Sequence, residues 1–286
     1  MSAILESIQS FTGSTERLVE IQESVNSITR QLTDKHDMKI LDWLSPERGR
    51  MRHHEVRSRR TPGTGKWVLN TSFFQDWINP ESPQRFLWLV GAPGCGKSTL
   101  LSLVIDELKL SHTGIAYYYC DYRVQSTNPL TLILGSLLRL FVEQQLGGLP
   151  QSLRDLFETS NNESRPPSPS EIESIMRTLT ASLPRCFILV DAIDEFSVED
   201  TRQTAQLTRL LDTLAEGGVY VFVTSRTAPT PSLKSSHLVI QHTADEADIK
   251  SYVAHTLQDD DSMIDILDTQ LQRHISEAIV QHAKGM

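Results

Sequence analysis

A glycine-rich segment at residues 91–99 carries the strongest chemical signal in the chain. Its sequence, GAPGCGKST, fits G-x-x-x-x-G-K-[ST], and it lies between an apolar run at 86–90 and a helical pattern. In such a loop, backbone N–H groups and a helix N-terminus surround phosphate oxygens. The residues that we predict to contact a nucleotide are Gly91, Ala92, Pro93, Gly94, Cys95, Gly96, Lys97, Ser98 and Thr99.

Two side chains of this loop have their own expected roles. Lys97 can reach the β- and γ-phosphates and is predicted to be catalytic, while the hydroxyl of Ser98 can ligate Mg²⁺. The loop binds phosphates and does not read the base. The motif alone therefore leaves ATP and GTP as alternatives.

A cluster of acids follows a second apolar run, Cys186–Val190. Asp191 is placed to hold Mg²⁺, and either Asp194 or Glu195 is placed to orient or deprotonate an attacking water. Clustered carboxylates repel each other unless a cation is near, which is a further reason to expect Mg²⁺.

Arg226 directly follows a third apolar run, at residues 219–223, and the sequence TS. At this position a cation could contact the γ-phosphate and respond to its loss, so we predict Arg226 to be catalytic. The alternative is an arginine that only extends its charged group into solvent at a strand end.

Short apolar runs alternate with helical patterns along the chain, which predicts an α/β fold with a parallel sheet and helices on both faces. The expected strands are residues 86–90, 115–120, 186–190, 219–224 and 237–240. The expected helices are residues 97–110, 129–145, 169–182, 201–215 and 245–257.

Four regions are expected from composition and pattern. Residues 1–45 form an N-terminal helical segment, in which a coiled-coil-like apolar seam from Ile4 to Leu32 packs on its own protein or mediates self-association. Residues 46–82 form a basic linker and lead-in, residues 83–258 a P-loop NTPase domain, and residues 259–286 the start of a truncated helical region. Within the NTPase domain, Thr159–Ser170 is expected to be a mobile surface loop.

Composition narrows the function class. The chain has 286 residues, 27 Lys and Arg against 36 Asp and Glu, and a formal net charge of −9, so non-specific nucleic-acid binding is not expected. Three widely spaced cysteines fit reduced thiols better than disulfides. With neither a signal-peptide pattern nor a membrane-span pattern, we expect a cytoplasmic protein.

The three motifs GAPGCGKST, CFILVDAIDE and YVFVTSR together resemble the NACHT class of STAND NTPases. The closest resemblance is to the fungal NOD-like receptor group with a nephrocystin-type N-terminal domain. The segments 40–44 and 63–77 are similar too, so the resemblance covers about residues 36–286. In similar sequences the chain continues past the equivalent of residues 283–286 into a winged-helix region.

The resemblance implies an ASCE-type sheet, in which the strand before Arg226 lies between the strands that end at Gly91 and Asp191. It also implies that Gly63–Trp67 helps to cover the nucleotide, with ATP favoured. Slow hydrolysis would act as a signalling switch in innate immunity, with protein partners bound through effector or C-terminal regions.

Two other functions remain open at this stage. One is a nucleotide-binding interaction scaffold with little or no turnover. The other is a small-molecule P-loop kinase, for which the sequence shows no arginine-bearing lid. His242 and His282 have no evident partners in the sequence and are interpreted as ordinary surface or packing residues.

Overall fold

A computed structural model describes most of the chain, namely residues 35–46, 48–112, 114–121, 123, 128–144, 148–196, 201–228, 233–259 and 269–283. The chain divides into two compact units, 1–46 and 47–286. In the first unit, residues 35–44 are helical, and the predicted seam Ile4–Leu32 lies outside the described residues. The second unit contains every predicted site residue.

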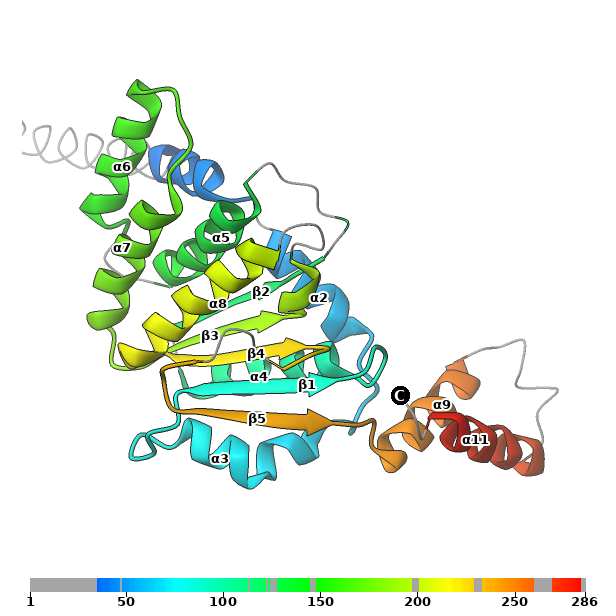
Figure 1. Ribbon diagram of the computed structural model, residues 1–286. Helices are drawn as coiled ribbons and strands as arrows, with labels where there is room; N and C mark the ends of the chain where they lie inside the picture. Colours follow the sequence, from blue (N-terminus) through cyan, green and yellow to red (C-terminus); the bar gives the residue numbers. More distant parts are fainter. Residues whose placement is uncertain are drawn as a thin grey trace, which may run out of the picture. The chain divides into compact units, whose positions relative to one another are not determined.

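The second unit alternates strands and helices along the chain (Figure 1). Its strands are β1 (Phe86–Gly91), β2 (Gly114–Tyr119), β3 (Cys186–Asp191), β4 (Tyr220–Ser225) and β5 (His237–His242). Its helices are α2 (Arg48–Ser58), η1 (Lys66–Asn70), α3 (Ser72–Ile78), α4 (Lys97–Ser111), α5 (Pro129–Glu143), α6 (Gln151–Asn162), α7 (Pro169–Ala181), η2 (Ile193–Glu195), α8 (Thr201–Glu216), α9 (Glu246–Asp259) and α11 (Thr269–Ala283).

The strands form a five-stranded sheet in the order β2-β3-β4-β1-β5, with every pair parallel. Strands β1 to β4 are buried along their whole length, as expected for strands covered on both faces. In the view of Figure 1, α8 passes in front of the sheet and α4 lies behind it. The predicted α/β fold is therefore confirmed, including the position of β4 between β1 and β3.

Within the basic segment expected at residues 46–82, Arg48–Ser58 form helix α2, which the sequence did not predict. His53 of this helix is buried, with Nδ1 2.8 Å from the hydroxyl of Tyr119 in β2 and Nε2 3.0 Å from Oδ1 of Asp106 in α4. Arg57 and Arg60 also form ion pairs with Asp106. His53, Arg57 and Arg60 contact an acid that is distant in sequence, and for this reason local composition could not reveal the packed helix.

The predicted surface loop Thr159–Ser170 is shorter than expected, because both of its ends are helical. Helix α6 continues to Asn162 and α7 begins at Pro169. Ser168 caps α7 in a capping box, in which its side chain accepts from the backbone N–H of Glu171 and its own N–H donates to the Glu171 carboxylate. This confirms the helix start that the sequence Ser-Pro-Ser-Glu predicts.

Two further expectations can be compared with the structure. All three cysteines are buried and free. Within the described residues, no helix combines the length and the apolar character that crossing a membrane requires.

Candidate functional site

The predicted phosphate-binding loop connects the end of β1 to the start of α4. Gly94 and Gly96 have φ values of +83° and +93°, a left-handed conformation that favours glycine. Gly91 is required for another reason, since a Cβ atom there would lie 2.6 Å from the carbonyl oxygen of His242 and 2.7 Å from Cys95 Sγ. The glycine spacing of the motif thus follows from backbone geometry and close packing.

The ammonium group of Lys97 lies against the loop. Its Nζ donates to the carbonyl oxygens of Gly91 and Ala92, both at 2.8 Å. Because α4 begins at Lys97, the N–H groups of its first turn have no partners within the helix and are directed out of its N-terminal end. The loop therefore presents a cation and backbone donors together, which is the chemistry that binds phosphate.

A cavity of about 340 Å³ lies between this loop and the ends of β3 and β4. Its lining residues are Pro93, Gly94, Gly96, Lys97, Ser98, Thr99, Asp191, Ala192, Asp194, Glu195 and Arg226. The structure thus brings most of the predicted site residues together. Gly91, Ala92 and Cys95 shape the loop without lining this cavity, and Ala192 is a member that the sequence did not predict.

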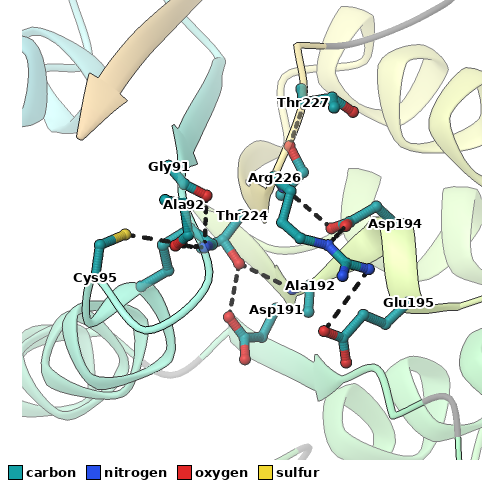
Figure 2. A network of polar contacts seen from close by, with 12 residues as sticks. Gly91, Ala92, Cys95, Asp191, Ala192, Asp194, Glu195, Thr224, Arg226 and Thr227 are labelled. Atoms are coloured by element: carbon teal, nitrogen blue, oxygen red, sulfur yellow. Dashed lines mark hydrogen bonds and ion pairs between the residues drawn. The ribbon is translucent and has the colours of Figure 1, made fainter. Parts of the chain in front are cut away.

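The carboxylate of Asp191 is held by a neighbouring strand (Figure 2). The hydroxyl of Thr224, the penultimate residue of β4, donates to Asp191 Oδ1 at 2.6 Å and accepts from the backbone N–H of Ala192 at 2.8 Å. Ala192 has a φ of +50°, which is unfavourable for a residue with a side chain. Thr224 therefore fixes both the carboxylate and the strained turn that follows it.

Mg²⁺ fits the oxygen donors of this corner. Burial raises the pKa of Asp191, while hydrogen bonds from Ser98 and Thr224 and the charge of Lys97 oppose that rise. A nearby cation would favour the charged carboxylate. Among the described residues, no three or more His, Cys, Asp or Glu side chains are grouped to hold a metal. Proteins commonly bind Mg²⁺ through one or two carboxylates together with substrate phosphates. The Asp191 carboxylate and the Ser98 hydroxyl fit this pattern of ligands.

Arg226 distinguishes the two neighbouring acids. Its Nε and Asp194 Oδ2 form an ion pair, and its backbone N–H donates to Asp194 Oδ1 at 3.2 Å. The guanidinium also lies 3.9 Å from Glu195 Oε1, and Figure 2 shows it between the two carboxylates. The hydrogen bond to Asp194 raises the pKa of Arg226. Asp194 thus forms an ion pair and a hydrogen bond with Arg226, whereas Glu195 makes only a longer contact with it.

Glu195 has the electrostatics of a proton acceptor. Burial raises its pKa, the charge of Arg226 opposes the rise, and the charges of Asp194, Asp191 and Asp121 add to it. A carboxylate with a raised pKa is a stronger base than one in water. The sequence left Asp194 and Glu195 as alternatives for this role, and the geometry favours Glu195.

A second cavity, of about 240 Å³, adjoins the first and shares Gly94, Gly96 and Thr99 with it. Its other walls come from four segments: residues 59–65, the phosphate-binding loop with the first turn of α4, His242 with the residues that follow β5, and the first turns of α9. These walls are lined by Arg59, Thr61, Thr64, Gly65, Cys95, Leu100, His242, Ala244, Asp245, Asp248, Ile249 and Tyr252. Residues of the phosphate-binding loop therefore line both cavities.

A chain of contacts joins the walls of the second cavity. Asp248 Oδ2 of α9 accepts from the backbone N–H of Gly65 at 3.0 Å and from Trp67 Nε1 at 2.9 Å. The Trp67 ring stacks on His242, with centroids 5.4 Å apart. His242 Nε2 lies 2.9 Å from the carbonyl oxygen of Cys95.

His242 is buried, as expected of a packing residue, but it has partners that the sequence did not reveal, because its ring contacts the phosphate-binding loop and lines a cavity. Burial lowers its pKa, as does the charge of Lys97. The position of His242 at the carboxyl end of a parallel strand, where ligand sites gather in α/β sheets, was the available sequence signal. His282, in α11, hydrogen-bonds to the carbonyl oxygen of Ala278, one turn earlier in its own helix.

Comparison with known families identifies the domain. The family described as "Nephrocystin 3, N-terminal" matches residues 63–226, more than half of the chain. The chain belongs to this family. The matched segment begins at Gly63 and ends at Arg226, so it contains the phosphate-binding loop, the acid cluster and the arginine. The resemblance to NACHT-class STAND P-loop NTPases is confirmed.

Individual relatives are more distant. The vegetative incompatibility protein HET-E-1 of Podospora anserina is 32% identical over 111 residues, which cover 38% of this chain and 8% of that protein. The chain therefore matches only a small part of the length of this curated relative.

Similar solved structures include AMPPCP-bound DnaA from Aquifex aeolicus, with a TM-score of 0.41 and 12% identity over 78% of this chain and 62% of that one. A Walker-type ATPase of Pyrococcus abyssi has a TM-score of 0.41 and 12% identity over 68% of this chain and 58% of that one.

Proposed function

We propose that this chain binds a Mg²⁺–nucleoside triphosphate at the loop of residues 91–99 and hydrolyses it slowly, as a signalling switch. The observation that carries the proposal is the 340 Å³ cavity, into which the loop, Asp191, Glu195 and Arg226 converge. Membership of the family supports it. ATP is proposed as the nucleotide, with GTP as the alternative.

The triphosphate binds on the loop and the N-terminus of α4. Lys97 exchanges its contacts with the carbonyl oxygens of Gly91 and Ala92 for charged phosphate oxygens, because charge-assisted hydrogen bonds are the stronger ones. The second cavity accommodates the nucleoside, with Gly63–Trp67 supplying part of the cover, since it is continuous with the loop and lined by both apolar and acidic side chains.

Ser98 and Asp191 are the residues that would hold the metal. Bound there, Mg²⁺ would offset phosphate charge and orient the phosphates for attack. Thr224 keeps the carboxylate of Asp191 turned toward Ser98 and the loop, as its hydrogen bond to Oδ1 indicates.

Hydrolysis uses Glu195 as the base. A water oxygen forms a bond to the γ-phosphorus, the bond from that phosphorus to the bridging oxygen breaks, and the diphosphate leaves. The proton of the water passes to the Glu195 carboxylate. Arg226 leaves Asp194 and stabilises charge on the γ-phosphoryl oxygens, as the neighbouring Lys97 does.

The two acids provide the test. Phosphate release and Mg-ATP binding are measured for the wild type, Glu195→Gln and the matched variant Asp194→Asn. We expect Glu195→Gln to keep binding and to lose about 100-fold or more in release rate, the usual contribution of a general base. Asp194→Asn, which keeps an oxygen acceptor for Arg226, should lose much less. Equal release by Glu195→Gln and the wild type would remove Glu195 from the base role.

The alternative is a nucleotide-binding scaffold with little turnover. The observation that favours it is the ion pair between Arg226 and Asp194, which occupies the guanidinium until a phosphate displaces the Asp194 carboxylate. Tight binding without phosphate release by the wild type would select this function.

A further inference from the structure

The geometry points to His242 as a positioning residue, which orients the peptide between Cys95 and Gly96 in the phosphate-binding loop and couples that loop, through Trp67, to α9. This inference rests on the proposed function of the loop in nucleotide binding. It assigns His242 no contact with the reacting atoms.

His242 forms a hydrogen bond with the carbonyl oxygen of Cys95 in the loop. A carbonyl oxygen only accepts, so His242 Nε2 must carry the proton and donate to Cys95 at 2.9 Å. In a trans peptide the C=O of one residue and the N–H of the next point in opposite directions. Holding the Cys95 oxygen on the side of β5 therefore directs the N–H of Gly96 to the opposite side, and Gly96 lines the phosphate cavity.

His242 is itself held rigidly by its backbone. His242 pairs with Gly91 in the parallel ladder and is the buried residue of the otherwise partly exposed strand β5. Its carbonyl oxygen occupies the space that a side chain at position 91 would need. His242 thus contacts the loop at its beginning, through Gly91, and near its end, through Cys95.

Trp67 connects His242, and through it the loop, to α9. The ring of His242 stacks on Trp67 at an interplanar angle of 29°, and Trp67 Nε1 donates to Asp248 in the first turn of α9. Asp248 also accepts from the backbone N–H of Gly65, so both ends of the segment 65–67 are attached to this helix. A shift of α9 would move Trp67 and, through the ring stack, His242.

Two substitutions separate the hydrogen bond from the ring stack. His242→Phe keeps a ring against Trp67 and removes the donor, whereas His242→Gln keeps an amide donor and removes the ring. We expect Mg-ATP affinity to fall about threefold to tenfold in His242→Phe, the equivalent of one hydrogen bond, and to be largely restored in His242→Gln. A merely structural role would not give rescue by the amide.

A double-mutant cycle tests the coupling to α9. Asp248→Ala removes the acceptor of both Gly65 and Trp67, and its effect on Mg-ATP affinity is measured in the wild type, in His242→Phe and in His242→Gln. We expect the loss of Mg-ATP affinity caused by Asp248→Ala to be at least about threefold smaller in both His242 variants than in the wild type. The reason is that His242→Phe lacks the hydrogen bond to the loop and His242→Gln lacks the ring stack on Trp67. Lys250→Ala removes an exposed ion pair with Glu246 in the same helix and serves as the control. Its effect on Mg-ATP affinity should be the same in the wild type and in both His242 variants.

The outcomes separate the two proposals. Wild-type protein that binds no Mg-ATP would overturn the proposed function together with this inference. Wild-type binding accompanied by unchanged affinity in His242→Phe, or by strictly additive effects of Asp248→Ala in the folded variants, would overturn the role of His242 alone. Circular dichroism identifies the folded variants. If one of the two His242 variants does not fold, the double-mutant cycle can still be measured with the other.

Discussion

At the scale of single residues, the site gives different surroundings to two acids that are neighbours in sequence. The Asp194 carboxylate contacts both the guanidinium and the backbone N–H of Arg226. Glu195 Oε1 lies 3.9 Å from the same guanidinium, and burial raises the pKa of Glu195. The sequence predicted both acids but could not rank them, because Arg226 reaches them from a neighbouring strand. The roles of Thr224 and His242 were missed for the same reason, since their partners lie on segments that are distant in sequence.

Arg226 should distinguish triphosphate from diphosphate. If it moves from Asp194 to the γ-phosphate, Arg226→Ala loses a charge-assisted contact that only the triphosphate makes. We expect the preference for Mg-ATP over Mg-ADP to fall by about tenfold or more, measured by calorimetric titration. Arg177→Ala, which removes an exposed α7 arginine paired with Glu173, should leave this preference unchanged. An unchanged preference in Arg226→Ala would contradict the sensor role.

The rate of phosphate release should depend on pH through Glu195. A base must be deprotonated to accept a proton, so the rate rises as pH increases through the pKa of Glu195. Burial raises this pKa, which places the midpoint of the rise above the ordinary value of 4.5. Initial rates across the acidic to neutral range measure it. The rise should vanish in Glu195→Gln, and a rise that persists there would assign it to another group.

At the scale of elements, each side chain that we propose to be catalytic is placed by the end of a strand or the start of a helix. The apolar runs predicted β1, β3 and β4 to within one or two residues, because strands buried on both faces are continuously apolar. Helix α2 was not predicted, because its many arginines are typical of a segment exposed to solvent. Its buried contact is made by a histidine, His53. Helix starts with local capping signals, such as that of α7, were predicted correctly.

The capping box of α7 should contribute measurably to stability. Ser168→Ala removes the acceptor for the N–H of Glu171, and we expect a loss of about 1 kcal/mol in the free energy of unfolding. Urea denaturation measures the loss. Thr178→Ala, an exposed site within the same helix, should change stability by no more than about 0.5 kcal/mol. Equal effects of the two substitutions would show that the box contributes nothing.

At the scale of the whole molecule, the strand order brings distant segments to one edge of the sheet. Placing β4 between β1 and β3 puts Thr224 beside Asp191 and Arg226 beside Asp194, although 32 or 33 positions separate each pair in sequence. The order itself came from the family resemblance, because spacing along a chain does not determine which strands are neighbours. The four regions proposed from the sequence remain predictions.

The division into two units predicts that nucleotide binding and self-association can be separated. All site residues lie in residues 47–286, so a chain of these residues should keep the Mg-ATP affinity of the full protein. If the seam Ile4–Leu32 mediates self-association, only the full chain should form concentration-dependent oligomers in sedimentation experiments. Oligomers of equal size in both chains would place the contact outside residues 1–46.

The most direct test of the central claim is calorimetric titration of the full chain with ATP, GTP and their diphosphates, in the presence and absence of Mg²⁺. Lys97→Ala is titrated alongside, with circular dichroism to show that it is folded. We predict saturable, Mg²⁺-dependent binding of a triphosphate by the wild type and its loss in Lys97→Ala, because Lys97 supplies the cation of the loop. Equal triphosphate affinity in the two proteins would contradict the assignment of residues 91–99 as the phosphate-binding site.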